Sequence, residues 1–493
     1  MNARLLGATV VAALGGLLFG FDTAVISGTT DWLRQVFALD RPWLGLPGSF
    51  WLGFTVASAL VGTIVGSVAT GKPADLLGRR RTLVWIAVLY FVSAVGSALA
   101  WDWWSLLFFR FIGGIGVGGA SVVSPMYIAE ISPARLRGRL VAVTQFNIVL
   151  GILLAFLSNW IIARIDLGPA EWRWMFGVEA IPAAAFFFLL FFVPRSPRWL
   201  VAQRRHDEAR EVLLRLGVEP AEVDREIAEI DVSLALARHS LAEPFFRRAY
   251  RRPILLAVAI AMFNQLSGIN ALMYYAPHIF KMAGAGESSA LLQAVGVGLM
   301  NLVFTMLALA VIDHFGRKAL MIAGSIGYIV SLGATAVAFG VHRAEFAAAF
   351  EAAQALERLR AAADAAPAAL AAAEAAVETA SSAAAFGGTI VLASLLVFIA
   401  SHAFGQGAVI WVFISEIFPN RVRARGQALG SFTHWIMAAA ISWTFPVIAE
   451  WSGAYTFAFY AAMMVLQLLW VWFVMPETKG VPLEEIQRRM GIE

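Results

Sequence analysis

The sequence DLLGRR at residues 75–80 returns as DHFGRK at residues 313–318. Each copy is followed by a second shared motif, which reads EISPARLRG at 130–138 and EIFPNRVR at 416–423. Both motifs combine a carboxylate with basic residues, and both stand between long apolar segments. Two motifs that recur in the same order at matching places predict two structurally similar halves.

The 493 residues are 60% hydrophobic and only 14% charged, with a mean hydropathy of +0.74. A soluble protein carries about 25% charged residues. Apolar segments of about 20 residues, long enough to cross a bilayer as a helix, recur along the chain. The sequence therefore predicts an all-α polytopic membrane protein. We expect twelve spans in two six-helix halves, near residues 5–28, 50–71, 83–101, 105–128, 140–163, 173–193, 253–277, 290–312, 319–340, 387–414, 427–449 and 454–475.

Lysine and arginine gather in alternate connections between these spans. The basic connections begin at residues 72, 130, 195, 313, 416 and 476. By the positive-inside rule, these connections and both termini face the cytoplasm. The predicted organisation is an N-terminal half (1–194), a cytoplasmic helical linker (195–252), a C-terminal half (253–475) and a cytoplasmic tail (476–493).

An alanine-rich insertion at residues 342–386 interrupts the C-terminal half on the outer side. Alanine is the strongest helix former, and the charged side chains of the segment make it too polar to span a membrane. We predict a helical hairpin hinged at Pro367. Its expected role is that of a structural spacer, and a periplasmic contact is the alternative.

The composition excludes several kinds of chemistry. The chain has no cysteine, which excludes disulfides and thiol catalysis. Its seven histidines are scattered without metal-ligand spacing, and no nucleophile–base arrangement stands out. We therefore expect neither an enzyme nor a metal or other cofactor. The net charge of +4 comes from loops on one side, which indicates membrane topology rather than nucleic-acid binding.

One carboxylate, Asp22, lies inside the first predicted span. A charge at that depth costs roughly 2.5–3.5 kcal/mol on insertion scales, so such residues normally face the bundle interior and belong to an ion or substrate path. The alternative is that Asp22 caps the end of the span near the lipid headgroups.

The repeated motifs predict ion pairs at the membrane surface. Carboxylates pair with arginines at helix ends, where cations also meet the negative C-termini of helices. Such pairs would clamp the cytoplasmic ends of the two halves together as a gate. Topology alone would explain the arginines but not the fixed carboxylates. The residues expected in this gate are Asp75, Arg79, Arg80, Glu130, Arg137, Asp313, Arg317, Glu416 and Arg423.

Further segments carry a family pattern. They read PMYIAE at 125–130, PRSPRWL at 194–200, NQLSGIN at 264–270 and PETKG at 476–480. In this order they resemble the sugar porter family of the major facilitator superfamily, whose members include bacterial xylose/proton symporters and animal glucose facilitators. The resemblance covers the chain except the insertion at 342–386.

The resemblance implies a secondary active transporter that imports a monosaccharide with a proton by alternating access. It also implies a monomer embedded in the lipid bilayer of the bacterial inner membrane, with no nucleic-acid partner. The main alternative is a uniporter of the same fold. A sugar sensor and a drug/proton antiporter are more distant alternatives.

Neutral amides suit a sugar, because each supplies donors and an acceptor without a buried charge, and aromatic faces suit its C–H side. By resemblance, the sugar lies at the bilayer midplane between the halves. The implied contacts are Phe19, Gln145, Asn264, Gln265, Asn270, Tyr275, Asn301, Gly407, Trp411, His434 and Trp435.

Four residues depart from the family pattern. Arg195 stands where a glutamate is usual, at a cytoplasmic ion pair. Asn264 replaces a glutamine, His434 an amide and Ala408 a proline, all at or near the implied sugar site. These departures leave a hexose, a pentose and a cyclitol open as the substrate.

The resemblance also implies the coupling residues. Asp22, Arg110 and Glu179 match the proton-coupling trio of the bacterial symporters. Facilitators of the family usually lack the acid at the Asp22 position, so its presence favours symport. A change in the surroundings of Asp22 during transport would let it load and release one proton per cycle. Glu179 is alternatively a structural partner of Arg110.

Overall fold

The computed structural model describes residues 2–39, 41–133, 135–240, 244–361, 366–419, 421–481, 483–490 and 492, with the backbone alone at 236–240, 313, 361, 483, 484, 487 and 489. The described residues form helices and connecting loops and contain no strand. The all-α architecture predicted from the apolar segments is confirmed.

The N-terminal half comprises α1 (Ala3–Val25), η1 (Ile26–Gly28), α2 (Thr30–Val36), α3 (Gly48–Ala69), α4 (Gly71–Leu77), α5 (Arg79–Ala98), α6 (Trp103–Ile131), α7 (Arg137–Ala163), η2 (Gly168–Ala170), α8 (Glu171–Gly177) and α9 (Ala180–Leu189). The linker holds α10 (Pro197–Ala202), α11 (His206–Leu216), α12 (Val223–Ser240) and η3 (Arg248–Tyr250). Short amphipathic helices suit a connector that lies on the membrane surface.

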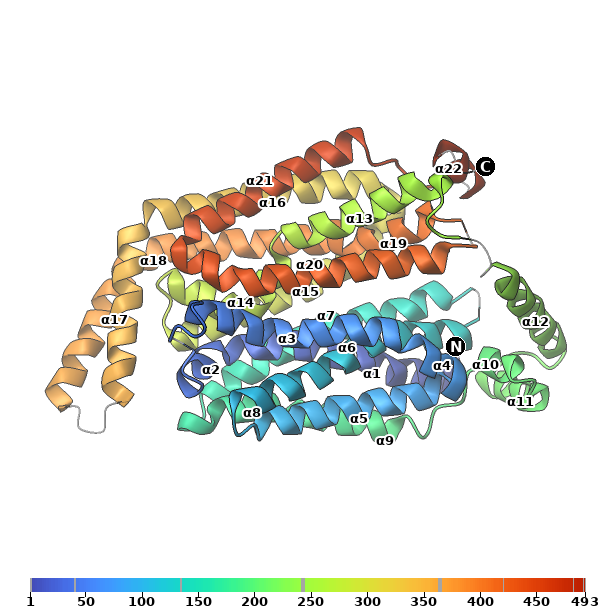
Figure 1. The fold of residues 1–493 in the computed structure, drawn as a ribbon, viewed down its shortest axis with the longest axis horizontal. Helices are drawn as coiled ribbons and strands as arrows, with labels where there is room; N and C mark the ends of the chain where they lie inside the picture. Colours follow the sequence, from blue (N-terminus) through green and yellow to red (C-terminus); the bar gives the residue numbers. More distant parts are fainter. Residues whose placement is uncertain are drawn as a thin grey trace.

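The C-terminal half comprises α13 (Arg251–Leu266), α14 (Ile269–Met282), α15 (Glu287–Phe315), α16 (Arg317–Val341), α17 (Arg343–Ala361), α18 (Pro367–His402), the π-helix η4 (Ala403–Gly407), α19 (Ala408–Ile417), α20 (Arg423–Trp451) and α21 (Gly453–Phe473), followed by α22 (Leu483–Met490). Figure 1 shows the two halves as layers of roughly parallel helices. We call the end that carries α10–α12 and α22 the linker end, and the opposite end, from which α17 projects, the hairpin end.

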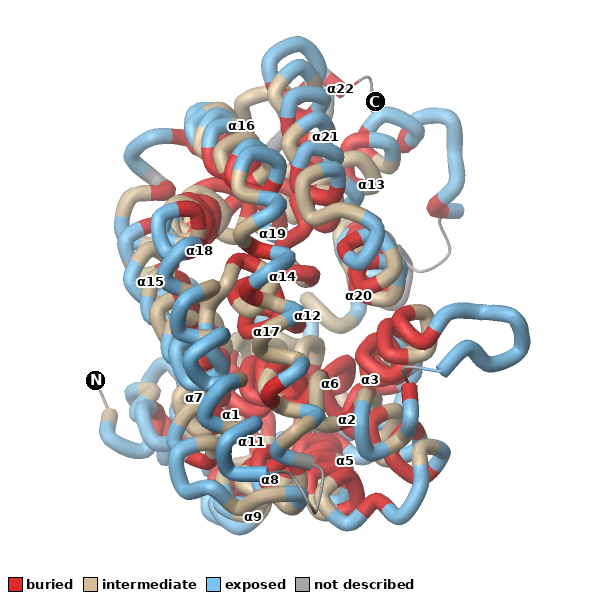
Figure 2. Tube along the Cα trace, turned by 90° about the vertical axis from the view of Figure 1, so that its left-hand side faces the viewer, coloured by how far each residue is buried: buried red, intermediate tan, exposed pale blue. Residues whose placement is uncertain are grey.

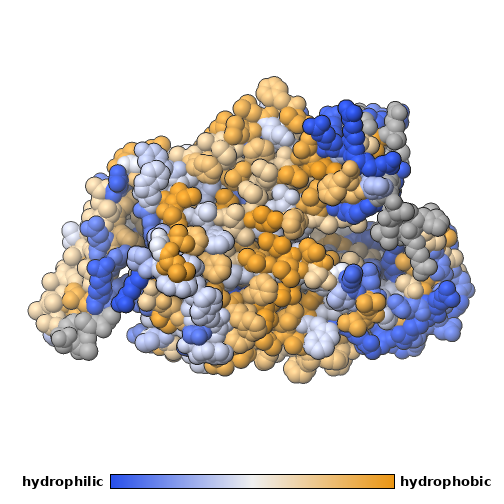
Figure 3. All heavy atoms as spheres, in the orientation of Figure 1, coloured by the Kyte–Doolittle hydropathy of each residue, from blue (hydrophilic) through white to orange (hydrophobic). Residues whose placement is uncertain are grey.

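Eleven helical segments among the described residues are long and apolar enough to cross a membrane. The sixth predicted span, at 173–193, is the exception, because it is divided into α8 and α9 at residues 178–179. Large apolar side chains are exposed around the molecule, such as Phe192 at 85% and Phe473 at 76%. Figure 3 shows an apolar middle region between more polar ends, as expected of a surface that meets lipid.

Small residues let the helices approach closely within and between the halves. A Cβ at Gly53 of α3 would lie 2.0 Å from the carbonyl oxygen of Trp443 of α20, so only glycine permits this contact between the halves. Such close backbone approach is typical of membrane helix packing. Helices α7 and α15 form the second main contact between the halves. Figure 2 shows buried segments toward the inside of each half and exposed ones outside.

Besides the sixth span, three spans are interrupted within the described residues. The first passes from α1 into a 3-10 turn at Ile26, and the tenth contains the π-helix 403–407. The seventh is interrupted between α13 and α14 at Gly268, whose φ of +83° is a conformation that other residues rarely adopt. Broken helices build the binding sites of many secondary transporters.

The alanine-rich insertion forms α17 and the first turns of α18, which begins with Pro367 in its first turn. The two helices pack side by side and project from the hairpin end (Figure 1). At the base of the hairpin, Phe350 lies 6.2 Å from the His278 ring of α14, measured between ring centroids. The insertion is therefore in contact with the broken seventh span.

Candidate functional site

Gln265 is the centre of a buried polar cluster between α13 and α20. Its side chain is fully buried, and Nε2 donates a hydrogen bond to Oδ1 of Asn264 at 2.9 Å. The same nitrogen lies 3.2 Å from Nε2 of His434. The amide oxygen of Gln265 has no hydrogen-bond partner within the described residues. Because an unsatisfied buried acceptor costs about 1–3 kcal/mol, this oxygen is suited to a ligand donor.

Aromatic rings continue the cluster toward the N-terminal half. The His434 ring lies 5.3 Å from the Trp411 ring and 5.0 Å from the Trp435 ring. Trp435 in turn lies 5.6 Å from Phe19 of α1, which belongs to the other half. The structure therefore brings together an amide cluster and an aromatic wall from the first, seventh, tenth and eleventh spans.

The other predicted sugar contacts lie on other elements. Asn270 follows the Gly268 break, and Gln145 lies on α7; both are half-buried, and their side chains make no hydrogen bond within the described residues. Asn301 of α15 is buried and accepts a long hydrogen bond of 3.5 Å from Thr305. Gly407 is half-buried at the end of the π-helix. These positions leave at least two amide groups free to bind a ligand.

Tyr275 differs from the other predicted contacts. Its side chain is fully buried, and its hydroxyl donates to the carbonyl oxygen of Ser442 at 2.9 Å. The ring packs against Phe445 at 5.1 Å. The hydroxyl thus joins α14 to α20, and the structure does not bring it to the Gln265 cluster.

A buried ion pair lies in the N-terminal half. Nη1 of Arg110, on α6, donates to Oδ1 of Asp22, on α1, at 2.5 Å. The exposed fractions of the two side chains are 1% and 4%. The guanidinium also lies over the Phe176 ring, 5.4 Å from its centroid. Asp22 therefore faces the bundle interior, and the alternative of a headgroup cap is wrong.

Glu179 is buried at the break between α8 and α9. It lies close enough to Asp22 and Arg110 to interact electrostatically, but it makes no ion pair in the described part of the chain, and its Oε1 has no hydrogen-bond partner there. The fully buried hydroxyl of Tyr90, on α5, is also without a partner in the described part and interacts electrostatically with both carboxyl groups. Sequence reasoning missed Tyr90, since a single tyrosine in an apolar span carries no distinctive pattern.

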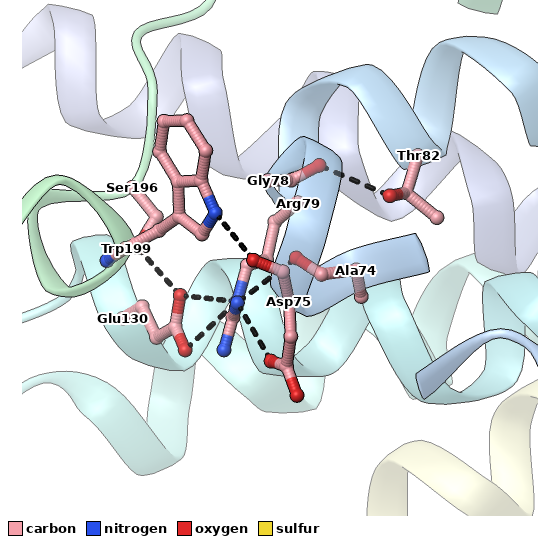
Figure 4. A network of polar contacts seen from close by, with 8 residues as sticks. All are labelled: Ala74, Asp75, Gly78, Arg79, Thr82, Glu130, Ser196 and Trp199. Atoms are coloured by element: carbon pink, nitrogen blue, oxygen red, sulfur yellow. Dashed lines mark hydrogen bonds and ion pairs between the residues drawn. The ribbon is translucent and has the colours of Figure 1, made fainter. Parts of the chain in front are cut away.

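The repeated motifs form matching networks at the linker end. In the N-terminal half, Arg79 pairs with Glu130 at 2.9 Å and with Asp75 at 3.1 Å (Figure 4). The hydroxyl of Ser196 donates to Glu130 at 2.5 Å, and the indole of Trp199 donates to the carbonyl oxygen of Asp75 at 2.8 Å (Figure 4). The linker is thereby attached to the ends of α4 and α6.

The C-terminal half repeats this arrangement. Arg317 pairs with Glu416 at 2.8 Å, and the hydroxyl of Thr478 donates to the same carboxylate at 2.6 Å. Glu477 accepts hydrogen bonds from the backbone N–H groups of Arg317 and Lys318 at 3.1 and 2.9 Å. These backbone donors outweigh the effect of partial burial and lower the pKa of the Glu477 carboxyl.

These pairs correct one prediction. The ion pairs of Arg79 and Arg317 join elements of the same half, so in this conformation they do not clamp the two halves together. Arg80 and Arg137 donate to backbone carbonyl oxygens, those of Val193 at 3.0 Å and Ala129 at 3.1 Å, rather than to carboxylates.

The last two residues of the predicted gate are Arg423 and Asp313. Within the described residues, Nε of Arg423 is buried without a hydrogen-bond partner, and Arg423 makes no ion pair. The side chain of Asp313 lies outside the described residues. The predicted pairing therefore holds for Asp75, Arg79, Glu130, Arg317 and Glu416.

Ion pairs between the halves lie at the hairpin end. Nζ of Lys281, on α14, lies 2.8 Å from Asp31 of α2, and Arg34 of α2 lies 3.1 Å from Glu450 of α20. Burial raises the pKa of Asp31, but the Lys281 charge and a hydrogen bond from His278 outweigh burial and hold that pKa well below its usual range. Sequence reasoning missed these pairs, because each is a single charge outside any repeated motif.

Two similar six-span halves, broken helices beside unsatisfied buried amides, and a buried ion pair define a secondary transporter. A family model described as "Sugar (and other) transporter" matches residues 8–355 and 362–490. The chain belongs to this family, within the major facilitator superfamily, as the sequence motifs predicted.

Named relatives and a solved structure agree with this assignment. The D-xylose-proton symporter of Escherichia coli K12 is 37% identical, over 97% of this chain and 94% of the relative. The arabinose-proton symporter of Bacillus subtilis is 32% identical, over 97% of this chain and 93% of the relative. The xylose transporter of E. coli, in a partially occluded inward-open conformation, superposes with a TM-score of 0.80 at 35% identity, covering 98% of this chain and 100% of that chain. The twelve-helix major facilitator fold is confirmed.

Proposed function

We propose that this protein imports a monosaccharide together with a proton by alternating access and has no enzymatic activity. The buried Asp22–Arg110 pair carries the proposal, because an intramembrane acid with a movable partner is what proton coupling requires. The relatives named above transport xylose or arabinose with a proton. We therefore favour a pentose among the sugars that the sequence leaves open.

The sugar site is the cluster around Gln265. The unsatisfied amide oxygen of Gln265 would accept from one sugar hydroxyl, while the free amides of Asn270 and Gln145 would bind others. The tryptophan rings at 411 and 435 and the Phe19 ring offer apolar faces to the C–H side of the ring. Because Phe19 and Gln145 belong to the N-terminal half, the sugar would be held by both halves.

Coupling would operate through the Asp22 carboxyl. Protonation neutralises Asp22 and weakens its 2.5 Å pair with Arg110, which then leaves a buried cation in need of another partner. Glu179 is the neighbouring acid without an ion pair in the described part of the chain. Transfer of Arg110 between the two carboxyls would give α1 and α6 two discrete arrangements, and the bound proton would select between them.

Alternating access would break the contacts at the hairpin end. The Lys281–Asp31 and Arg34–Glu450 pairs close that end here, so an outward-open state must release both. We place the linker end and both termini in the cytoplasm, since the basic connections gather there. The protein would then act as a monomer in the bacterial inner membrane, with α17 and the start of α18 as a spacer outside it.

Proteoliposomes loaded with a pH-sensitive dye test this function. D-xylose, L-arabinose and D-glucose are added in turn, and the transported sugar should drive proton movement into the vesicle together with its own uptake. Asp22→Asn should abolish the proton signal, whereas the exposed linker variant Asp231→Asn should not change it. Sugar uptake without proton movement in the unmodified protein would establish a uniporter.

A further inference from the structure

A tyrosine–histidine pair lies beside the sugar site and takes no part in the function proposed above. His402 is the last residue of α18 and immediately precedes the π-helix that ends at Gly407. Tyr328 of α16 is fully buried, and its hydroxyl lies 2.6 Å from Nδ1 of His402. The Tyr328 ring packs against Phe398 at 5.2 Å. One edge of the imidazole is thus fixed by a side chain that is itself immobilised.

The other edge of the imidazole runs along Gly407. A Cβ placed on Gly407 would lie 3.4 Å from Cδ2 and 3.5 Å from Nε2 of His402. Nε2 makes no hydrogen bond in the described part of the chain, and the His402 side chain is half-buried. Position 407, a residue of the predicted sugar site, therefore carries no side chain that would cover this edge.

Tyr328 also stands between two helix breaks. The side chain of Ser267, next to the break at Gly268, is within hydrogen-bonding reach of the Tyr328 hydroxyl. The pair therefore connects the break in the seventh span to the π-helix in the tenth. Both kinds of irregularity concentrate at functional sites, because they free polar groups and redirect side chains toward a ligand.

We propose that His402 is a specificity-determining residue of the sugar site, whose Nε2 bonds one hydroxyl of the bound monosaccharide, and that Tyr328 is the positioning residue that fixes the ring. This inference rests on the proposed function, because it adds a contact to the same site. A neutral imidazole has one donor and one acceptor, and Tyr328 occupies the Nδ1 side. A sugar hydroxyl both donates and accepts, so it satisfies Nε2 in either tautomer.

The position of His434 supports the placement of His402 at the sugar site. His434 interacts with the Gln265 amide on one side, and it is close enough to His402 to interact electrostatically with it. The two imidazoles would therefore approach the sugar from α20 and from the end of α18. The competing explanation is that Tyr328 and His402 only hold α16 and α18 together, as polar pairs between membrane helices do. Such a role would affect stability but not the discrimination between sugars.

The test is a double comparison of protein variants and sugar analogues. Calorimetric titration of the full-length protein in lipid nanodiscs first identifies which of D-xylose, L-arabinose and D-glucose binds best. The monodeoxy analogues of that sugar are then titrated. We expect His402→Phe to weaken binding of the parent sugar about five- to 150-fold, which corresponds to about 1–3 kcal/mol. One deoxy analogue lacks the hydroxyl that Nε2 is proposed to bond. The unmodified protein should bind this analogue more weakly than the parent sugar, whereas His402→Phe should bind the two equally well.

Two further variants separate contact from positioning. His402→Gln keeps a donor and an acceptor, so it should restore part of the discrimination that His402→Phe loses. Tyr328→Phe should reduce discrimination for the same hydroxyl and for no other. His206→Phe, on the linker, is the matched control and should bind every analogue as the unmodified protein does.

The outcomes are distinct. If His402→Phe keeps the unmodified ratios for every analogue, His402 is not a sugar contact, whatever happens to stability. If His402→Phe does not fold, the ratios of His402→Gln and Tyr328→Phe decide the question in the same way. Gln265→Ala is titrated in parallel: unchanged binding there would overturn the proposed sugar site itself, whereas weakened binding with unchanged His402 ratios would overturn only the present inference.

Discussion

At the scale of single residues, the sites proposed above contain buried polar atoms that lack a partner in the described part of the chain. The Gln265 amide oxygen, the Glu179 carboxyl and the Tyr90 hydroxyl are all buried without a partner in the described part of the chain. Each such group costs free energy in the folded protein unless another molecule completes it. In the function proposed above, a sugar would complete the first, and a proton or a displaced arginine would complete the others.

Gln265→Ala should weaken sugar binding by about 1–3 kcal/mol, or roughly five- to 150-fold in affinity, because the bound hydroxyls lose a partner in a dry site. Tryptophan fluorescence quenching on the purified protein measures this, with Trp411 and Trp435 beside the cluster. Gln293→Ala removes an amide that bonds only Ser289 and should leave affinity unchanged. Equal affinity in both variants would show that the sugar does not bind beside the seventh span.

Asp22→Asn should abolish sugar accumulation while leaving sugar counterflow measurable, because the amide keeps the shape of the carboxylate but cannot exchange a proton. Counterflow between sugar-loaded vesicles measures exchange without a gradient. A parallel loss of counterflow and binding would instead assign Asp22 to the sugar site or to folding.

Sequence patterns were sufficient for some of these residues and not for others. A family motif pointed to Gln265 and Asn270, and Asp22 stood out as a carboxylate inside an apolar span. No pattern pointed to Tyr90, Tyr328 or His402, because their roles depend on which side chains face them across helix interfaces. Tyr275 is a further case, because the sequence could not show that its hydroxyl donates to the carbonyl oxygen of Ser442.

At the scale of elements, the break in the seventh span divides its amides between two helices. Gly268 separates α13 from α14 with a φ of +83°, and a Cβ there would come within 2.7 Å of the Tyr460 ring. The break leaves Gln265 at the end of α13 and Asn270 at the start of α14. The apolar pattern of the sequence predicted a span here but could not reveal the break, because the pattern reports the length of the apolar segment and not the backbone conformation of Gly268.

Gly268→Ala should lower stability by about 1–2 kcal/mol from backbone strain alone, with a further cost from the contact with Tyr460. Thermal unfolding in detergent, followed by intrinsic fluorescence, measures the loss. Gly333→Ala, in α16 with nothing within 4 Å of the added Cβ, is the control and should be neutral or slightly stabilising. Unchanged stability and sugar binding in Gly268→Ala would show that the break tolerates a side chain.

The ion pairs at the hairpin end should keep α14 packed against the N-terminal half over a wide pH range. The pKa of Asp31 lies below its usual value in the folded protein. Its pairing with Lys281 therefore contributes its full stabilisation at pH values above the usual pKa of an aspartate, and this stabilisation is lost only as the pH falls through the depressed pKa. Asp31→Asn removes the negative charge at neutral pH. We expect amide hydrogen exchange in α14 to become about fivefold faster, which corresponds to a loss of about 1 kcal/mol in the free energy that stabilises the closed hairpin end.

Hydrogen-exchange mass spectrometry checks this expectation. Glu229→Gln, which breaks the exposed Arg225–Glu229 pair on α12, is the matched control and should leave α14 unchanged. Exchange in α14 that is equally slow in Asp31→Asn would mean that packing alone keeps this end closed.

At the scale of the whole molecule, transport depends on two similar halves that contact each other at opposite ends in turn. The repeated motifs predicted two similar halves, and the composition of the connections predicted the linker and the insertion. They did not allow the conformation to be predicted, because both ends carry charges that can pair within a half or between halves. The structure shows Arg79 and Arg317 pairing within halves, and Lys281 and Arg34 pairing between them.

Coupling to one proton sets a limit on accumulation. A membrane potential of 100 mV supplies about 2.3 kcal/mol per charge, which supports roughly fifty-fold accumulation of a neutral sugar. Vesicles energised by a potassium diffusion potential should approach this ratio for the transported sugar, and a protonophore should return it to one. Full accumulation with the gradient dissipated would reject proton coupling.

The hairpin formed by α17 and the start of α18 offers a way to watch these movements directly. Helix α17 has 19 residues and is therefore about 28 Å long, and its base touches α14 through Phe350. If the base tilts by about 10° with α14, the tip is displaced by about 5 Å, so the helix acts as a pointer that magnifies small rotations. The chain has no cysteine of its own, so one introduced near the tip would carry a single fluorophore or spin label without background. The insertion thus makes this transporter suited to single-molecule recording of its opening and closing.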